Sequence, residues 1–373
     1  MFNEISYIDY HQDYTTPRKS MFLNGKIGLI ENLRNEFPDI WKHYKKLKAL
    51  DWEETEIDIS ACRGEFKNGD PAINDLMIKT LAWQFEADSS AAHVGALMLP
   101  LTSASELQCF LIEHMKNESL HSLAYKFIVE SSFDNPEEFL QVLLSIEESF
   151  KRLASVKKVF DEVYLISHKY AVGLETDKRK VRKAIFKFWA AVFALERIQF
   201  MGSFSITFGL AEGLDGNSRF VPIAKLVQKI CTDEYQVHVQ AARDILRNEM
   251  NIEDNFGIYM EVRDEIAEII HEITQSELTW LDFLFGEDEA RAGIRKNKIV
   301  NFVLYSATDV YNFFGMENPF GAVEENPIPW MNNWIVIDNN QSAPQEESTG
   351  NYLLGAYIDD NNTIDMSKYN LKF

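Results

Sequence analysis

Residues 117–125, NESLHSLAY, are the most informative stretch of this sequence, because they place three reactive side chains on one face of a predicted helix. His121 follows Glu118 by three residues and Tyr125 follows it by seven, so the side chains lie along two successive turns. A carboxylate and an imidazole at this spacing can bind a metal ion beside an oxidisable phenol. A solvated Glu with a capped or core His explains the same pattern, so it needs support from elsewhere in the chain.

Apolar residues recur at helical spacing over most of the chain, and alternating strand-like runs are rare. Several helical segments exceed twenty residues, which favours an all-α bundle of long antiparallel helices. Prolines punctuate the pattern, as at Pro100 between two segments and Pro136 at the start of another. The expected helices lie near residues 26–48, 68–90, 104–131, 136–170, 179–211, 220–249, 256–284 and 289–316.

The composition indicates a globular, acidic protein. Its 58 acidic and 37 basic residues give a formal charge of −21, and 46% of its 373 residues are hydrophobic. This charge disfavours nucleic acid or an anionic membrane as a partner, although a solvated surface is its ordinary explanation. The three cysteines (Cys62, Cys109 and Cys231) are widely spaced and odd in number, which argues against a disulfide framework.

Neither a signal peptide nor a membrane span is predicted. The N-terminus carries acids and no apolar stretch of signal-peptide length, and the apolar residues 192–211 are interrupted by Glu196 and Arg197. We therefore expect a cytoplasmic protein, which would mean the host cytoplasm if a phage encodes it.

The composition changes near the C-terminus. Residues 338–351, DNNQSAPQEESTGN, contain turn and disorder formers and almost no apolar side chains. Apolar residues return in 352–373 without a clear helical or strand period. We predict a helical domain at 1–338 and a flexible tail at 339–373 that docks on another protein; a merely frayed terminus is the alternative.

A second set of acids supports the metal-site interpretation. A four-helix bundle holds two metal ions when two helices each give an acid and two give a Glu with a nearby His. Asp88, in WQFEADSS, lies in the helix before Glu118, and CTDEYQVH offers Glu234 with His238. Glu196 lies in the apolar run FALERIQF, where an unpaired carboxylate would be costly. Alternatively, Glu196 pairs with Arg197, and Glu234 and His238 form a surface pair.

Eight ordered blocks across the chain resemble the small, radical-bearing subunit of class Ia ribonucleotide reductase, of the enterobacterial and phage type. They are SMFLNG, DWEETEIDIS, LMLPLTSASEL, ESLHSLAY, FALERIQFMGSF, KICTDE, NPIPWMNNW and APQEESTGNYLLG. The resemblance spans nearly the whole chain. It implies a ferritin-like helical bundle, a di-iron centre that uses oxygen as the activating oxidant, a homodimer, and a large catalytic subunit as partner.

The resemblance also implies roles for individual residues. Asp88, Glu118 and His121 would bind one iron, Glu196 and His238 the second, and Glu118 and Glu234 would bridge them. Tyr125 takes the place of the stable tyrosyl radical. The remaining roles are an apolar pocket around that radical (Phe200, Phe204 and Ile230), a radical-transfer route (Trp52, Asp233 and Tyr352), a tail acid for the same step (Glu346), and a tail to Phe373 that docks on the large subunit.

One departure from the family pattern concerns the second ligand pair. The family has Glu-x-x-His there, whereas Glu234 and His238 are four residues apart. Both spacings keep the two side chains near one helix face. A one-residue insertion in a helix commonly forms a π-bulge, so we predict one near residues 233–238.

The leading hypothesis is therefore that the chain generates a radical on Tyr125 and lends it to a partner that reduces ribonucleotides. One alternative is a di-iron oxidase or desaturase of the same fold with its own substrate, which would have no use for Trp52, Tyr352 or the tail. Another is a non-catalytic metal-binding bundle, which leaves Tyr125 unexplained. Manganese in place of iron remains open, because the same ligands accept both.

Overall fold

Long helices dominate the computed structural model, which describes residue 13, residues 15–25 and residues 28–335. The predicted tail, 339–373, lies outside these residues. The α-helices are α1 (Pro38–Ala49), α2 (Cys62–Asn68), α3 (Pro71–Ala91), α4 (Val94–Met98), α5 (Ser105–Ser132), α6 (Pro136–Leu143), α7 (Glu147–Ala171), α8 (Lys178–Ala194), α9 (Met201–Glu212), α10 (Val221–Asp233), α11 (Val239–Met250), α12 (Glu253–Phe285), α13 (Lys296–Phe313) and α14 (Asn332–Ile335).

Four short elements interrupt or connect these helices. Two are 3₁₀ turns, η1 (Leu99–Leu101) and η4 (Pro329–Met331), and two are π-helical segments, η2 (Leu195–Phe200) and η3 (Glu234–His238). Because η2 joins α8 to α9 and η3 joins α10 to α11, residues 178–212 and 221–250 each form one continuous rod. The all-α prediction is confirmed, and the strands in the described ranges are limited to the pair β1 (Ala290–Arg291) and β2 (Ile294–Arg295).

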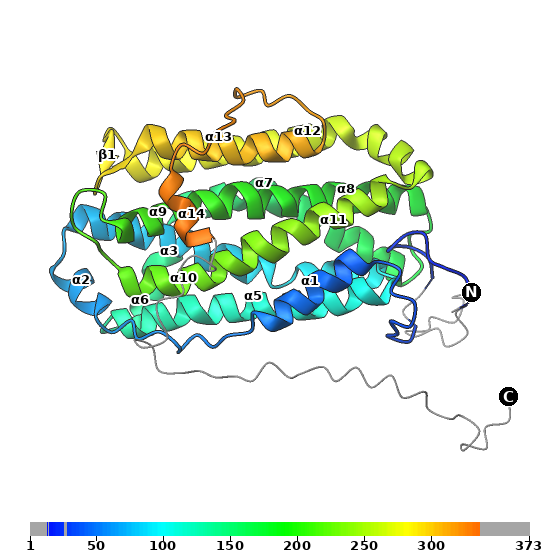
Figure 1. Ribbon diagram of the computed structural model, residues 1–373, viewed down its shortest axis with the longest axis horizontal. Coiled ribbons are helices and arrows are strands. Elements are labelled where there is room, and N and C mark those ends of the chain that lie inside the picture. The colour runs from blue at the N-terminus through cyan, green and yellow to red at the C-terminus, as the bar shows by residue number, and fades with distance from the viewer. Residues whose placement is uncertain (1–12, 14, 26–27, 336–373) are drawn as a thin grey trace, which may run out of the picture. The chain divides into compact units, whose positions relative to one another are not determined.

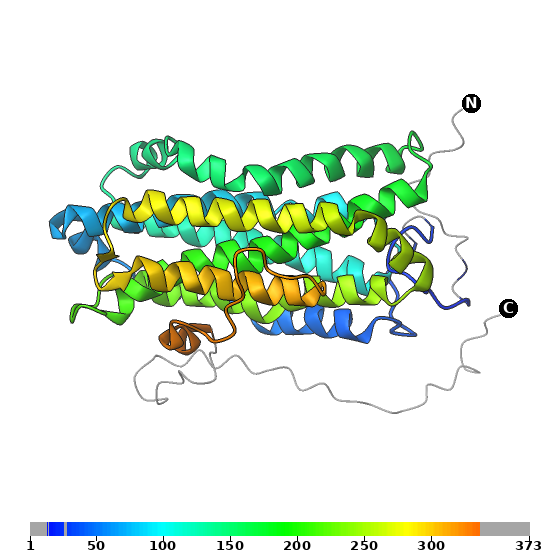
Figure 2. The same cartoon turned by 90° about the horizontal axis from the view of Figure 1, so that it is seen from above.

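The helices of the described unit pack side by side along their length. In Figure 1, α12 and α13 run along the upper edge, α5 and α1 along the lower edge, and α7, α8 and α11 between them. Figure 2 shows α12, in yellow, beside α7, in agreement with their contacts. Helix α3 packs on α5, and the π segments η2 and η3 contact each other. The two continuous rods therefore meet α3 and α5 in the interior of the bundle.

Side chains that cap or interrupt helices explain several of the element boundaries. Asp70 accepts a 2.8 Å hydrogen bond from the Ala72 amide at the start of α3, and Pro71 has the fixed φ that suits a first helical turn. Asp177 accepts from the amides of Arg179 and Lys180 at the start of α8. Gly213 ends α9 in the left-handed conformation (φ 65°).

Three predicted boundaries were wrong. The helix expected from residue 26 begins only at Pro38, after Asn35 adopts a left-handed φ of 47°. The segment expected at 136–170 is broken into α6 and α7 by a turn at residues 144–146. The helix expected from 289 begins at 296, because β1 and β2 form a hairpin whose two loop residues, Ala292 and Gly293, both have positive φ.

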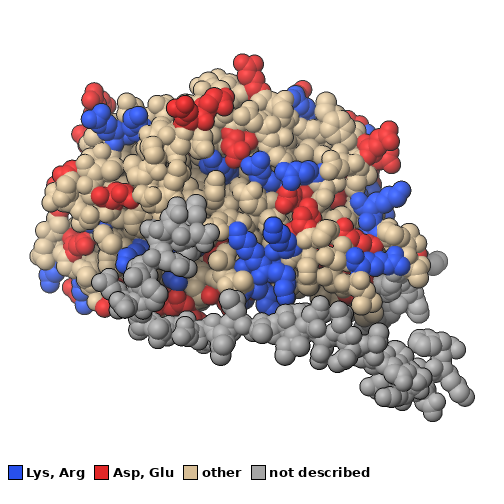
Figure 3. Space-filling model, viewed as in Figure 1, with Lys and Arg blue, Asp and Glu red and all other residues tan. Residues whose placement is uncertain are grey.

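The surface and the core differ sharply in polarity. Figure 3 shows Lys and Arg interspersed with Asp and Glu on the face displayed, as a solvated surface requires. In contrast, every residue from Ala184 to Ala211 is buried, apart from Lys187. None of the helices in the described ranges is long and apolar enough to cross a membrane. Glu196 lies in the middle of this buried segment, where a carboxylate needs a compensating positive charge.

Candidate metal centre

Four helical rods bring the predicted acids and histidines together in the core. Asp88 comes from α3, Glu118 and His121 from α5, Glu196 from η2, and the remaining pair from η3. All six side chains are buried, with at most 2% of any residue exposed. A cluster of four carboxylates at this depth requires positive charge to balance it.

The distances show that the carboxylates converge on the imidazoles. His121 Nδ1 lies 2.9 Å from Glu234 Oε1 and 3.4 Å from Glu118 Oε2. His238 Nδ1 lies 2.7 Å from Glu234 Oε2 and 3.2 Å from Glu118 Oε1. Glu118 and Glu234 therefore lie between the two histidines.

The ligand atoms form two overlapping groups, each compact enough to surround one ion. Within each group the atoms lie within 4.8 Å of one another. One group is Asp88, Glu118, His121 and Glu234, and the other is His114, Glu118, Glu196 and His238. Glu118 belongs to both, which suits a residue that bridges two ions.

His114 is the member of these groups that the sequence reasoning missed. It lies on α5 one turn before Glu118, and its Nε2 is 3.4 Å from Glu118 Oε1. The signal was available, because His114, Glu118 and His121 follow one another at i, i+4 and i+7 on a single helix face. The predicted pattern was a Glu followed by a nearby His, whereas His114 precedes Glu118.

The π-bulge predicted near residues 233–238 is confirmed by η3. The wider turn absorbs the extra residue, so both Glu234 and His238 face the centre despite their four-residue spacing.

The second π segment, η2, was not predicted. Inside η2, the backbone carbonyl of Gln199 accepts a 2.9 Å hydrogen bond from the Arg152 side chain. The side-chain amide of Gln199 donates to the backbone carbonyl of Arg152 at 3.0 Å. Arg152 thus stabilises the backbone that carries Glu196.

Burial and mutual repulsion strongly perturb the acids. Burial, assisted by the other carboxylates, raises the pKa of Glu196 well above its ordinary value, and burial likewise raises that of Asp88. Burial also opposes ionisation of Glu234, but the adjacent His238 and His121 still hold its pKa well below the usual range. Burial lowers the pKa of His238, but Glu234 and Glu118 outweigh it and raise that pKa to about 10. In the metal-free protein, protons therefore supply the balancing charge.

His114 behaves differently from the other two histidines. Burial, and then the neighbouring charge of His238, lower the pKa of His114 to about 4. By contrast, burial disfavours the charged form of His121, yet the carboxylates beside it, Asp233 first among them, raise its pKa well above the ordinary value.

The donor set fits a pair of hard or borderline metal ions. Asp88 and Glu196 are completely buried, and neither forms an ion pair with a basic side chain among the described residues. Carboxylates with imidazoles suit iron or manganese, whereas structural zinc sites rely largely on thiolates. Two cations would satisfy these carboxylates and neutralise four buried charges together.

Tyr125 lies one turn beyond His121 on the same helix and is almost fully buried. Its hydroxyl lies beside Asp88, the carboxylate with which it interacts most strongly. Burial, and then the charge of Asp88, raise its pKa well above the ordinary value. The side chain is therefore a neutral phenol enclosed beside the acids.

The three residues of the predicted apolar pocket are all completely buried. Phe200 belongs to η2 and its ring lies 5.7 Å from that of Phe204 on α9, while Ile230 belongs to α10. One aromatic ring that does contact Tyr125 is that of Phe85, with centroids 6.2 Å apart. Enclosure of Tyr125 by Phe200, Phe204 and Ile230 remains a prediction.

A hydrogen-bonded chain leads outward from the centre. Trp52 Nε1 donates to Asp233 Oδ2 at 2.8 Å, and the same oxygen lies 3.1 Å from His121 Nε2. Asn117 donates to this oxygen as well, at 2.9 Å. Two further residues predicted for this route, Tyr352 and Glu346, lie outside the described residues.

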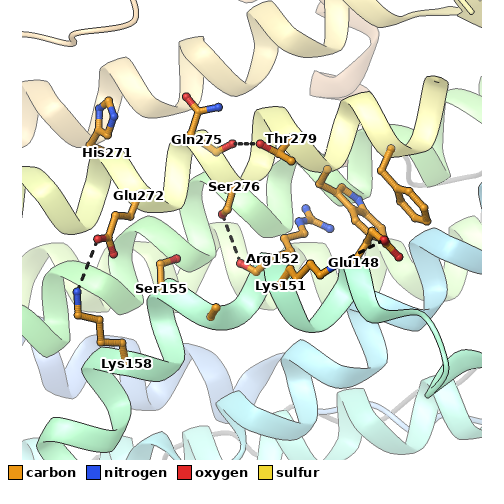
Figure 4. Close-up of a pocket in the computed structure, with 13 residues that line it drawn as sticks. Glu148, Lys151, Arg152, Ser155, Lys158, His271, Glu272, Gln275, Ser276 and Thr279 are labelled. Carbon is orange, nitrogen blue, oxygen red and sulfur yellow. Dashed lines mark hydrogen bonds and ion pairs between the residues drawn. The ribbon is translucent and has the colours of Figure 1, made fainter. Parts of the chain in front are cut away.

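A surface cavity of about 550 Å³ lies elsewhere, between α7 and α12. Figure 4 shows Ser276 bonded to the Arg152 carbonyl and Lys158 paired with Glu272 across it. None of its lining residues belongs to the two metal-capable groups. The centre is thus separate from this cavity.

Comparison with known proteins gives a consistent result. A family model described as "Ribonucleotide reductase, small chain" matches residues 30–327. The ribonucleoside-diphosphate reductase 1 subunit beta of Salmonella typhimurium is 26% identical over 370 residues, covering 95% of this chain and 96% of that protein. The ribonucleoside-diphosphate reductase subunit beta of Enterobacteria phage T4 is 24% identical over 348 residues, covering 85% and 88%.

Solved structures share the fold at lower sequence identity. The ribonucleotide reductase R2 subunit from Clostridium botulinum superposes with a TM-score of 0.70 and 16% identity, over 85% of this chain and 94% of that one. The Streptococcus sanguinis dimanganese(II)-NrdF gives a TM-score of 0.58 and 17% identity, over 80% and 95%. The predicted ferritin-like helical fold is thereby confirmed.

Proposed function

The chain belongs to the family of ribonucleotide reductase small chains, and from this premise we propose that it generates and stores a radical on Tyr125. As the small subunit of a ribonucleoside-diphosphate reductase, it is an oxidoreductase subunit. A large catalytic subunit would use the radical to reduce ribonucleotides to deoxyribonucleotides. The observation that carries the proposal is a buried set of metal-capable acids and histidines one helical turn from an enclosed tyrosine.

We assign the ligands as the resemblance implies. Asp88, Glu118 and His121 hold one ion, Glu196 and His238 hold the second, and Glu118 and Glu234 bridge them. The overlap of the two ligand groups at Glu118 supports this assignment. When bound, the metal pair supplies the one-electron oxidation of Tyr125, with oxygen as the oxidant. Two iron ions are the proposed cofactor, and manganese is the alternative with the same donors.

The protein's own residues manage the proton and exclude water. A tyrosine that loses an electron also loses its phenolic proton, and Asp88 is the carboxylate whose charge acts most strongly on Tyr125. Asp88 is therefore placed to hold that proton. Burial of Tyr125 keeps water and reductants away, and we assign the apolar shielding to Phe200, Phe204 and Ile230.

An electron and a proton would be exchanged with the large subunit. Their route would follow Asp233 and Trp52 to the surface and continue through Tyr352, with Glu346 assisting in the tail. The hydrogen bonds joining Trp52, Asp233 and His121 support the inner part of this route. We further propose that residues 339–373 dock on the large subunit, that the chain forms a homodimer, and that it functions in the cytoplasm. The family match disfavours an independent oxidase or a storage protein.

Electron paramagnetic resonance tests the proposal directly. Metal-free protein is reconstituted with ferrous iron and oxygen, and spectra are recorded for the native chain, for Tyr125→Phe and for the surface control Tyr164→Phe. A tyrosyl signal in the native chain and the control, with none in Tyr125→Phe, is the expected result. A signal of equal size in Tyr125→Phe would assign the radical elsewhere, and no organic radical in any sample would refute the proposal.

A further inference from the structure

A third histidine lies within the centre and has no role in the proposed ligand set. His114 is 1% exposed and projects from α5 one turn before Glu118, with Nε2 at 3.4 Å from Glu118 Oε1. Its ring centroid lies 4.2 Å from that of His238. The two imidazoles therefore lie next to each other, tilted by 38°, and both are close to Glu118 Oε1.

His114 completes a compact donor set with residues from other helices. Its ligand atom lies within 4.8 Å of those of Glu118, Glu196 and His238, which come from α5, η2 and η3. Both oxygens of Glu196 lack a hydrogen-bond partner among the described residues. A cation at this position would contact two imidazoles and two carboxylates at once.

A purely structural explanation accounts poorly for this residue. His114 Nδ1 is buried and has no hydrogen-bond partner among the described residues. An unsatisfied buried polar group costs on the order of 1–3 kcal/mol, and a phenylalanine of similar size would avoid that cost. Phe110, one turn earlier on α5, already packs against the ring at 5.6 Å.

We propose that His114 is a seventh protein ligand, bound through a ring nitrogen to the ion that Glu118, Glu196 and His238 hold. This inference rests on the proposed metal pair but not on the radical chemistry. It makes the two positions unequal: one ion has the single imidazole of His121, and the other has two imidazoles.

The additional imidazole has a consequence for metal preference. Imidazole nitrogen suits iron better than manganese, for which carboxylate and water oxygens are the preferred ligands. His114 therefore favours iron at the position it shares with Glu196. Its removal should weaken the binding of iron there more than that of manganese.

The test compares His114→Phe, which keeps an aromatic ring without a donor, with His168→Phe on the exposed part of α7. Metal-free proteins are titrated anaerobically with ferrous iron and, separately, with manganous ion. The native chain and the control should bind two ions. His114→Phe should bind one ion normally and the other at least about tenfold more weakly, with the larger loss for iron. Unchanged affinities for both ions would overturn the inference.

A crystal structure of the native chain soaked with manganous ion decides the point even if His114→Phe does not fold. Anomalous density for two ions, with one bonded to a His114 nitrogen, supports the inference. Two ions without that bond would overturn it while leaving the proposed function intact. Absence of any metal pair in the native chain would overturn both.

Discussion

Trp52 donates a hydrogen bond of 2.8 Å to Asp233, which joins a residue preceding α2 to the end of α10. Replacing Trp52 by Phe removes this hydrogen bond and so should interrupt the outward route. It keeps an aromatic ring at the position that stacks on His121, where the ring centroids are 6.0 Å apart, so the ligands should stay in place. We expect Trp52→Phe to form a normal tyrosyl radical, while ribonucleotide reduction with the large subunit falls to background. The control is Trp41→Phe on α1, which should retain both properties. Full turnover by Trp52→Phe would exclude this route.

Replacement of Glu196 by Gln should affect metal binding and leave the metal-free protein nearly unchanged. Burial raises the pKa of Glu196 well above its ordinary value, which favours the protonated side chain in the metal-free protein, and Gln resembles that neutral form. Each tenfold loss of affinity removes about 1.4 kcal/mol of metal-dependent stabilisation. Thermal unfolding with and without ferrous iron measures this, and Glu130→Gln on the surface should behave as the native chain does. A large loss of stability in the metal-free variant would contradict the expectation.

Deletion of Gln236 should convert η3 into a regular helix and restore the Glu-x-x-His spacing. A π segment contains one surplus residue, so its removal leaves the flanking helices in register. We expect the deletion protein to fold and to bind two metal ions. Deletion of Gln240 from the regular helix α11 is the control and should unfold the protein, because it rotates all later residues by about 100°. Circular dichroism and metal analysis distinguish the two, and equal damage from both deletions would argue against an insertion.

The stability of the protein should contain a contribution from Glu277 that is lost as the pH rises. Burial raises the pKa of Glu277 from 4.5 to about 7, although Arg152 pairs with it at 2.5 Å. The folded state therefore binds this proton more tightly than the unfolded state, so the contribution is complete below pH 4.5 and disappears through pH 7. Relative to Glu277→Gln, the native chain should lose roughly 3 kcal/mol of unfolding free energy between about pH 4.5 and 8. Denaturant titrations at several pH values measure this difference, and parallel pH profiles would refute the assignment.

Removal of residues 340–373 should separate radical storage from turnover. The metal ligands and Tyr125 all precede the deleted segment, so the truncated chain should keep its two ions and its tyrosyl signal. Its activity with the large subunit should be lost, and a peptide of the deleted sequence should inhibit the full-length chain by competition. Retained turnover by the truncated chain would show that the tail is not required for docking.

The sequence predicted the bundle because helices such as α1, α10 and α11 have one distinct apolar face. Where it failed, local backbone conformation outweighed that apolar pattern. The hairpin at 290–295 turns through Ala292 and Gly293, both with positive φ, and alanine gives little sign of such a turn. The start of α1 was predicted too early because residues 28–37 have apolar side chains at helical spacing. The helix itself begins at Pro38, whose fixed φ suits a first helical turn.

The candidate site was predicted from motifs at characteristic spacings, and two of the three parts that were missed have no such motif. The segment η3 was predicted because Glu234 and His238 are one residue farther apart than in the family pattern. The sequence FALERIQF shows no such extra residue, so the π turn at Glu196 was not predicted. The contact of Arg152 with Gln199 links residues 47 positions apart, and no helical period connects them. His114 precedes Glu118 by four residues, which reverses the order of the Glu-and-His pair that the bundle pattern predicts.

The burial of the ligands also limits how fast metal ions bind and leave. Since each acid and histidine of the two groups is almost inaccessible to solvent, an ion reaches them only when helices separate briefly. The rate of metal binding should therefore reach a maximum that is set by the opening rate of the bundle. Above that point it should no longer rise with metal concentration. The same barrier slows escape, so a loaded centre would retain its ions far longer than their affinity alone implies.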